Sequence, residues 1–309
     1  MQLLHCGKRT RNFGDALNAW FWARCLPGVL DDDPREVVFG IGTILCSGVP
    51  VPDATRRLHV LGSGCGYGNR PPDPRYRVWF VRGPRTAARL GVDASRAIGD
   101  PAMLLPRLLS GAAPMKRREP AFVPHIGSAL ACAWAAPCAL AGIRLVDPRT
   151  PTEAFIQAIR AAPLVLAESL HGAVVADAFG VPWVPVASSD DILSFKWEDW
   201  LDTLQLEYRP CRVPRRIPWG WNRVRGGLRR LADDLGLSRR AARTRWPSLF
   251  EPQPGVEACA EELLTASRQA PLLSQEDVRA RIMDRLSEAI AEFGRFARAA
   301  SLQCQCSRT

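Results

Sequence analysis

The chain has 309 residues, a formal net charge of +10 and 47% hydrophobic residues, which suffice for one large or two medium cores, and two domains is the expected number. No apolar run is long enough to cross a bilayer, and the start, MQLLHCGKRTRNFGD, lacks the apolar core and cleavage site of a signal peptide, so we expect a cytoplasmic protein. The ten cysteines lie mostly in apolar runs without a nearby set of metal ligands, which argues against a disulfide framework and against a metal site.

The first predicted unit is a strand over Leu3 to Cys6 and a helix over Ala16 to Leu26, joined by a loop that ends at Asp15. An aspartate before a helix accepts backbone N–H groups as an N-cap, but at the carboxyl end of a strand it can equally accept a proton from a substrate hydroxyl. Asn12 in the loop and Asn18 in the helix are predicted supports.

Further strands are predicted over Val37 to Leu45 and Leu58 to Leu61, and the second of them runs into a loop with glycines at 62, 64, 66 and 68. The spacing is not GxGxxG in any frame, and the prolines that follow cannot open the helix that a pyrophosphate site requires. Binding of NAD or FAD is therefore not expected. The glycines either let the backbone approach a ligand or the other domain closely, or form a plain wide turn.

Arg82 and Arg85 follow a predicted strand, Arg77 to Val81, and precede a predicted helix, Thr86 to Leu90. The helix dipole disfavours cations at this end, so an anion shared between guanidinium and backbone N–H groups would explain both arginines, whereas the alternative is a solvated pair. Asp100 precedes a proline at a first helical position, and we predict for it a structural N-cap without a catalytic role.

A polar, basic segment bounded by prolines, Gly111 to Pro120, is the predicted linker to a second half. The elements predicted after it are strands over Ala121 to Pro124, at Leu145 and Val146, over Leu164 to Leu166 and after Pro182, and helices from Ser128, from Thr152 and over Ala173 to Phe179. His125 and His171 then follow two strands of one sheet, so a shared cleft is expected.

His171 lies with Glu168 and Ser169 between a buried strand and a helix, where unpaired N–H groups and the helix dipole favour anions. Ligands bind at this edge in open α/β sheets. The alternative is that His171 only caps the helix beside Gly172, and the residues alone leave both interpretations open.

Several motifs occur together in one order. They are NFGDALN (12–18), LGSGCGYG (61–68), VRGPRTAARLGV (81–92), IGDPAML (98–104), FVPHIGS (122–128) and ESLHGAVVADAFGVP (168–182). In order and spacing this set resembles the polysaccharide pyruvyl transferases, and within them the succinoglycan-type pyruvyl ketalases, over the first two thirds of the chain. The resemblance implies two Rossmann-like domains in a GT-B-like arrangement and transfer of pyruvate from phosphoenolpyruvate to two sugar hydroxyls as a ketal, with release of phosphate.

This chemistry needs an acid that protonates the methylene carbon, cations for phosphate and carboxylate, and a base for the hydroxyls. The catalytic candidates are His171 as acid or phosphate ligand, His125 as its partner and Asp15 as base. The candidates for substrate binding are Arg82, Arg85, Ser169, Glu168, Lys196 and Asn12. No cofactor is implied besides the donor substrate.

One departure from the family pattern concerns the segment before His171. Many relatives have Ser-x-Arg-Leu-His-Gly, whereas here Ala167 stands for the serine and Ser169 for the arginine. The carboxylate contact would then pass to another cation such as Lys196, or the activity is altered.

The segment 209–246 collects much of the positive charge and is interleaved with tryptophans. Its members are Arg209, Arg212, Arg215, Arg216, Trp219, Trp221, Arg223, Arg225, Arg229, Arg230, Arg239, Arg240, Arg243, Arg245 and Trp246. Such a segment suits an anionic membrane surface or a pyrophosphate-bearing acceptor. No nucleic-acid fold signature accompanies it, so we expect a lipid-linked oligosaccharide acceptor at the inner face of a membrane, and no nucleic acid.

The chain ends in a predicted helix from Ser274, with a capping box closed by Asp277 and apolar residues every four positions from Val278 to Phe293. We therefore expect an α/β protein with an N-terminal Rossmann-like domain over 1–112 on the acceptor side, a second over 121–205 on the donor side, and a basic, mainly helical extension over 206–309. The alternatives are a GT-B-like glycosyltransferase that uses a nucleotide sugar, and an inactive scaffold of polysaccharide assembly.

Overall fold

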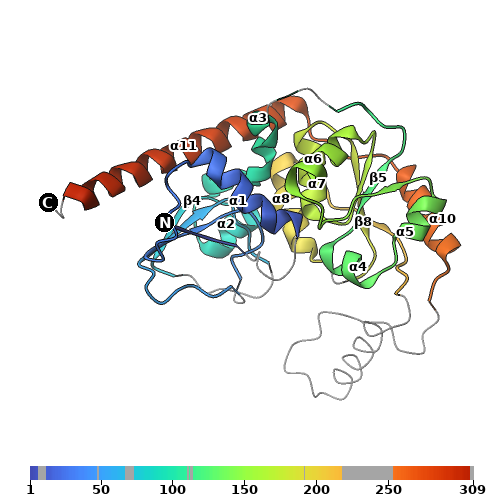
Figure 1. The fold of residues 1–309 in the computed structure, drawn as a ribbon, viewed down its shortest axis with the longest axis horizontal. Coiled ribbons are helices and arrows are strands. Elements are labelled where there is room, and N and C mark those ends of the chain that lie inside the picture. Colours follow the sequence, from blue (N-terminus) through green and yellow to red (C-terminus); the bar gives the residue numbers. More distant parts are fainter. Residues whose placement is uncertain are drawn as a thin grey trace, which may run out of the picture.

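The computed structural model describes residues 1–5, 12–46, 49–66, 73–109, 111, 114–190, 192–217 and 253–306, with side chains up to residue 300. Two parallel sheets lie side by side, each with helices packed on it (Figure 1). The helices are α1 Phe13–Cys25, α2 Pro84–Leu90, α3 Leu105–Leu108, α4 Ile126–Ala131, α5 Ala135–Leu140, α6 Thr152–Ala161, α7 Leu170–Ala178, α8 Ser194–Leu204, α10 Val256–Ser267 and α11 Glu276–Cys306, with 3-10 helices η1 Ala94–Arg96 and η2 Pro101–Leu104. The predicted α/β class is confirmed.

The first lobe is built on a four-stranded parallel sheet in the order β1-β2-β3-β4, with strands β1 Gln2–Leu4, β2 Glu36–Phe39, β3 Arg57–Leu61 and β4 Tyr76–Phe80. Alternate residues of a strand face opposite sides, so Val38 packs in the core with α1 and α11, whereas Val37 and Phe39 pack in the core that includes Ala87 of α2. Both faces of the sheet are therefore covered, as parallel sheets require.

The second lobe is built on a five-stranded parallel sheet in the order β6-β5-β7-β8-β9, with strands β5 Ala121–Val123, β6 Arg144–Leu145, β7 Val165–Ala167, β8 Trp183–Ala187 and β9 Cys211–Arg212. Phe122 faces a core with α5 and α10, and Val123 faces the core with α6 and α7. Gly172 lets α7 lie close to β5, because a Cβ atom there would be 2.9 Å from Val123 Cγ1. As predicted, the strands that precede His125 and His171 are neighbours.

The two lobes share one continuous apolar core. Phe13 of α1 stacks on Phe155 of α6 with ring centroids 4.0 Å apart, and both rings are buried. A second contact between the lobes joins α2 and α8. It is so close that a Cβ atom at Gly83 would be 1.6 Å from the carbonyl oxygen of Asp199. An interface that is tightly packed and continuous with the core holds the lobes in one relative position.

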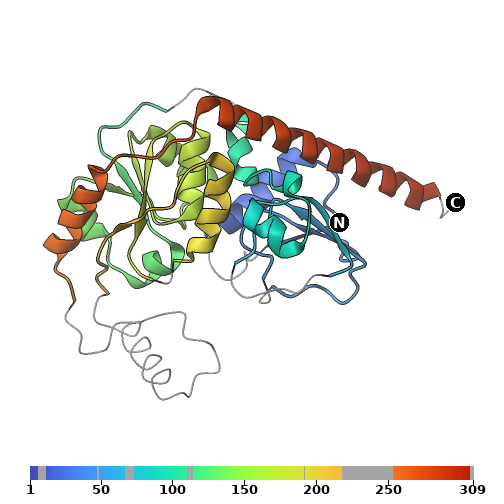
Figure 2. The same cartoon turned by 180° about the vertical axis from the view of Figure 1, so that it is seen from behind.

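Helix α11 runs along one side of the molecule and extends past the first lobe (Figures 1 and 2). Five of its apolar residues, spaced three or four positions apart, are at most 6% exposed, namely Val278, Ile282, Leu286, Ile290 and Phe293. The apolar face of this helix therefore packs on the body of the molecule. Helix α10 packs on α5 and on strands β8 and β9, and thus belongs to the second lobe. No helix among the described residues is long and apolar enough to cross a membrane.

The capping box predicted for α11 is wrong. The Ser274 hydroxyl donates to Oδ1 of the buried Asp177, and the Ser274 N–H donates to its Oδ2 at 3.0 Å. Trp183 Nε1 donates to the same oxygen at 3.0 Å. Because Asp177 lies far away in sequence, the local pattern of a serine followed by Asp277 could not reveal this competing acceptor.

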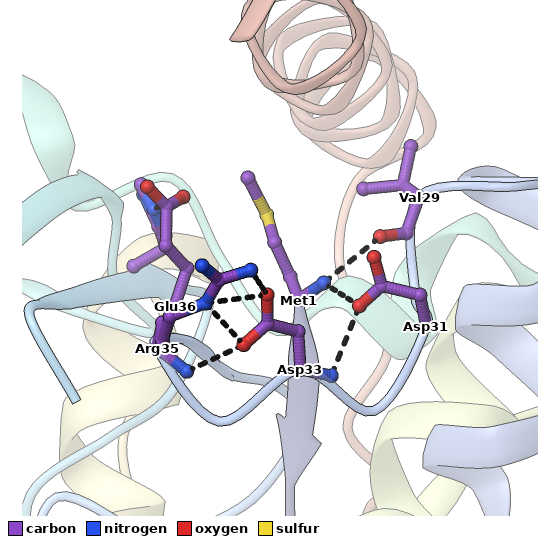
Figure 3. Close-up of polar contacts among 7 residues, drawn as sticks. Met1, Val29, Asp31, Asp33, Arg35 and Glu36 are labelled. Atoms are coloured by element: carbon purple, nitrogen blue, oxygen red, sulfur yellow. Dashed lines mark hydrogen bonds and ion pairs between the residues drawn. The ribbon is translucent and has the colours of Figure 1, made fainter. Parts of the chain in front are cut away.

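The loop between α1 and β2 is held by local carboxylates at the edge of the first sheet (Figure 3). Asp31 accepts from the amino group of Met1 and from the Asp33 N–H, the latter at 3.0 Å. Asp33 in turn accepts from the Arg35 N–H at 3.0 Å, and Arg35 lowers the pKa of this carboxyl. These are exposed contacts, so they fix the turn more than they stabilise the fold.

The boundaries of the three predicted segments stay predictions. Most of the basic segment 209–246 lies outside the described residues, which resume at Gln253. Within the described part, Arg209 pairs with Glu207 at 2.7 Å and Arg212 with Asp190 at 2.8 Å, both at the surface.

Candidate active site

Residues that follow strands of both sheets meet at His171. The ring lies in the first turn of α7, directly after β7, and is 15% exposed. Gly14 in the first turn of α1 lies against it, because a Cβ atom there would be 2.3 Å from His171 Nδ1. A side chain at position 14 would therefore displace the imidazole. The carboxyl edges of parallel sheets are where ligands bind in α/β proteins, so this cluster is the candidate active site.

Four charged groups act on His171. Burial lowers the pKa of His171, the carboxylates Asp100 and Asp15 raise it, and the cations Arg82 and Lys196 lower it. The nearest contact is between His171 Nε2 and Asp100 Oδ2, 3.8 Å apart. The ring thus lies between carboxylates of the first lobe and an ammonium of the second, and its pKa is lowered overall.

Asp15 lies in the first turn of α1, and its Oδ2 accepts from Asn12 Nδ2 at 3.3 Å. Burial raises the pKa of Asp15, while Asn12 and the nearby histidines His171 and His5 lower it. A carboxylate of raised pKa is a better base, which suits the predicted role. The predicted support by Asn18 is confirmed, because its buried side chain accepts from the Ile41 N–H at 2.7 Å and donates to the Gly14 carbonyl at 3.2 Å.

His125 follows β5 and caps α4, with Nδ1 accepting from the Gly127 N–H at 3.3 Å. Burial, and to a smaller extent the charge of Lys196, lowers the pKa of His125 to about 3. This histidine is therefore neutral near pH 7, and since Nδ1 accepts, Nε2 carries its proton. A neutral His125 can donate a hydrogen bond but is a poor source of a full proton.

Lys196 of α8 is 6% exposed, and within the part of the chain that the structure describes its ammonium forms no hydrogen bond and no ion pair. Burial, and next the charge of Arg82, lowers the pKa of Lys196 to about 8, while Glu168 raises it. A buried cation without a partner is unfavourable unless an anion binds to it. The ammonium lies near both histidines, since its charge acts on His125 and His171 alike.

Glu168 is fully buried and has structural partners. Its Oε2 accepts from the His125 N–H at 2.9 Å, and its Oε1 accepts from the Ser188 N–H at 3.1 Å and from the Ser188 hydroxyl. The carboxylate thereby joins the loops that follow β5, β7 and β8. Ser169, the N-cap of α7, is half-buried and its side chain makes no capping bond, so it is free to meet a ligand.

Arg82 lies at the carboxyl end of β4, and its guanidinium is buried among three partners of the protein itself. It donates to Asp199 Oδ2 at 3.2 Å, to Thr43 Oγ1 at 2.9 Å and to the Cys65 carbonyl at 3.2 Å. Asp199 also accepts from the Thr86 N–H at 2.8 Å and from its hydroxyl at 2.7 Å. The anion that the sequence predicts between arginine and helix N–H groups is therefore present, and it is the side chain of Asp199 from the second lobe.

Arg85 lies apart from the cluster. Its guanidinium is 43% exposed and pairs with Glu198 at 2.6 Å and with Asp202 at 2.8 Å, both on α8. The structure thus brings Asp15, Asn12, His125, His171, Lys196, Ser169 and Glu168 to one region, seats Arg82 beneath it and leaves Arg85 at the surface. Asp100 caps η2 as predicted. Sequence reasoning did not reveal that Asp100 lies beside His171, or that Asp199 is the partner of Arg82.

The ion pairs of Arg82 and Arg85 should differ in how much their disruption lowers the free energy of unfolding. Asp199→Ala leaves the buried Arg82 without its counter-charge, and we expect the free energy of unfolding to fall by about 3–5 kcal/mol. Arg85→Ala removes an exposed pair on the same two helices and should cost about 0–1 kcal/mol. Urea unfolding of both variants measures the difference, and equal losses would contradict the structural role of Arg82.

The carboxyl edges of two parallel sheets bring histidines and carboxylates next to Lys196 of α8, at the place where ligands bind in α/β proteins. The model of the family described as polysaccharide pyruvyl transferase matches residues 75–190, so the chain is similar to that family over this segment. It is similar to the succinoglycan biosynthesis protein ExoV of Rhizobium meliloti (strain 1021), with 45% identity over 206 residues, 66% of this chain and 65% of that protein. The match thus spans slightly less than two thirds of the relative's length. No solved structure matches the chain.

Proposed function

We propose that this protein transfers the pyruvyl group of phosphoenolpyruvate to two hydroxyls of an exopolysaccharide sugar as a ketal and releases phosphate. The observation that carries this proposal is the ammonium of Lys196, which is buried beside His125 and His171 and has no partner among the residues that the structure describes. Such an ammonium favours an anionic substrate, and the family match makes phosphoenolpyruvate the natural donor. Ser169 lies at the same edge, where relatives of the family have arginine, so Lys196 supplies the missing positive charge.

The reaction that we propose starts with transfer of a proton from His171 to the methylene carbon, which leaves C2 electron-poor. The first sugar hydroxyl forms a bond to C2 and loses its proton to Asp15. The C2–O bond to phosphate then breaks, and phosphate departs with the electron pair and takes up the proton held by Asp15. The second hydroxyl attacks C2 and loses its proton to His171, which restores the acid. Lys196 offsets the negative charge of the substrate carboxylate or phosphate throughout the reaction. The neutral His125 donates a hydrogen bond to the same anionic group.

The proposal is tested with the parent protein, phosphoenolpyruvate and a model glycoside that has two free hydroxyls. Phosphate release coupled to a product whose mass shows an added pyruvate ketal supports the proposal. A thermal-shift comparison of phosphoenolpyruvate with nucleotide sugars separates it from the glycosyltransferase alternative. Stabilisation by a nucleotide sugar alone, without phosphate release, would refute it.

A second candidate is an inactive scaffold of polysaccharide assembly, which is favoured by one observation, the serine at position 169. In that case Lys196→Met would leave binding of the oligosaccharide unchanged, and the parent protein would bind sugar without releasing phosphate.

We propose further that the lobes adopt a GT-B-like arrangement and that the acceptor is lipid-linked at the inner face of a membrane. The convergence of both sheets on His171 supports the first statement, and the arginines of 209–246 support the second. Each arginine near an anionic surface contributes about 1 kcal/mol, so Arg223, Arg225, Arg229 and Arg230 changed together to Glu should abolish binding to anionic liposomes at low salt. Equal sedimentation of parent and variant would contradict the membrane assignment.

A further inference from the structure

Asp100 and His171 face one another across the boundary between the lobes. Asp100 follows the first sheet and caps η2 through Oδ1, which accepts from the Ala102 N–H at 3.0 Å. Its Oδ2 points to His171 Nε2 at 3.8 Å. Among the described residues, neither of these two buried atoms has a hydrogen-bond partner. Asp100 is 0% exposed, so burial of its second oxygen has a cost that the cap does not offset.

A carboxylate next to a histidine ring, as Asp100 is to His171, can control how the ring exchanges protons. A carboxylate at one ring nitrogen fixes the orientation of an imidazole and stabilises its charged form, so that the other nitrogen exchanges protons with the substrate. Here the carboxylate lies at Nε2, which leaves Nδ1, the nitrogen beside Gly14. The other charges that face the ring are Asp15 of α1, Arg82 after β4 and Lys196 of α8.

We propose that Asp100 is the positioning residue of His171, supplied by the opposite lobe, and that Oδ2 and Nε2 close to hydrogen-bond distance when substrate binds. The gap to be closed is about 1 Å, since a hydrogen bond of this kind spans roughly 2.7–3.2 Å, and catalytic hydrogen bonds often tighten in the substrate complex. The role of His171 as the acid rests on the proposed function, whereas the contact between Asp100 and His171 does not.

Asp100→Asn isolates the charge, because asparagine is as good an N-cap as aspartate and η2 should stay intact. We expect the pKa of His171 to fall, since the carboxylate of Asp100 favours the protonated ring. NMR titration can follow this directly, because the chain has only four histidines. Turnover near pH 7 should fall about 10-fold or more, and the limb of the pH profile that requires protonated His171 should move to lower pH.

The matched control is Asp93→Asn. Asp93 caps η1 in the same way, accepting from the Ser95 N–H at 2.8 Å, but it is exposed and distant from His171. It should change neither the histidine pKa nor turnover. In addition, Asp100→Asn should have no further effect on turnover in a His171→Gln background, because residues that act as a unit are not additive.

An unchanged His171 pKa in a folded Asp100→Asn variant would overturn the proposal, and so would an equal loss of turnover in the parent and in the His171→Gln background. A parent protein that releases no phosphate from phosphoenolpyruvate would instead refute the proposed function. The titration still decides whether Asp100 and His171 are coupled in that case, so the two failures are distinguishable.

Discussion

Replacing His171 by glutamine lowers the turnover of phosphoenolpyruvate by about 10²-fold or more, because general acid catalysis contributes that much and glutamine has no proton to transfer. Glutamine keeps a hydrogen-bonding end of similar size next to Gly14, so the variant should stay folded and still bind phosphoenolpyruvate. Phosphate release and product mass, measured together on parent and variant, show the effect.

A structural histidine would give the opposite pattern. The melting temperature would fall by a few degrees while ketal formation stayed largely intact. Retained turnover in the glutamine variant would end the assignment of His171 as the acid and transfer it to His125, although burial lowers the pKa of that histidine to about 3.

Replacing Lys196 by methionine weakens the binding of phosphoenolpyruvate by about 1.5–3 kcal/mol, the contribution of a hydrogen bond to a charged group, which is roughly a 10- to 150-fold rise in Kd. Methionine keeps an apolar stem in the buried site. Because the unpaired ammonium is unfavourable there, the free energy of unfolding should not fall. Calorimetric titration and urea unfolding of the same preparation measure both quantities.

The pH dependence gives a second signature for Lys196. Its pKa is lowered to about 8, so the side chain is charged below that pH and neutral above it. The affinity of the parent for phosphoenolpyruvate should therefore decrease as the pH rises through about 8, and the methionine variant should lack this decrease. Lys116→Met is the control, because Lys116 is exposed and donates only to the Arg160 carbonyl, at 2.9 Å. Equal affinities of parent and Lys196→Met would contradict the role of this lysine.

The strands and the neighbouring positions of His125 and His171 could be predicted, because both depend on patterns local in sequence. Asp100 could not. The aspartate and proline that predict an N-cap account for one carboxylate oxygen, and the other meets a residue of the opposite lobe.

The partner of Arg82 is a second feature that the local sequence could not identify. The cation at a helix start correctly indicates an anion, but the anion is Asp199, more than a hundred residues away along the chain. A ligand and a distant carboxylate satisfy the same local charge pattern, so the sequence alone cannot separate them. Lys196 was predicted to bind substrate, but its burial without a partner follows only from the packing of α8.

The position of α11 has a consequence for synthesis of the protein in the cell. The first sheet is complete at Phe80, yet one of its faces is covered by Phe293, whose ring lies 5.3 Å from Trp79 and from His59. Roughly 200 residues separate the sheet from that helix, so at about 5–20 residues per second the nascent lobe leaves the ribosome with its aromatic face bare for about 10–40 s. During that interval the face is open to chaperones, and any stop in translation before residue 276 releases a chain that cannot cover it.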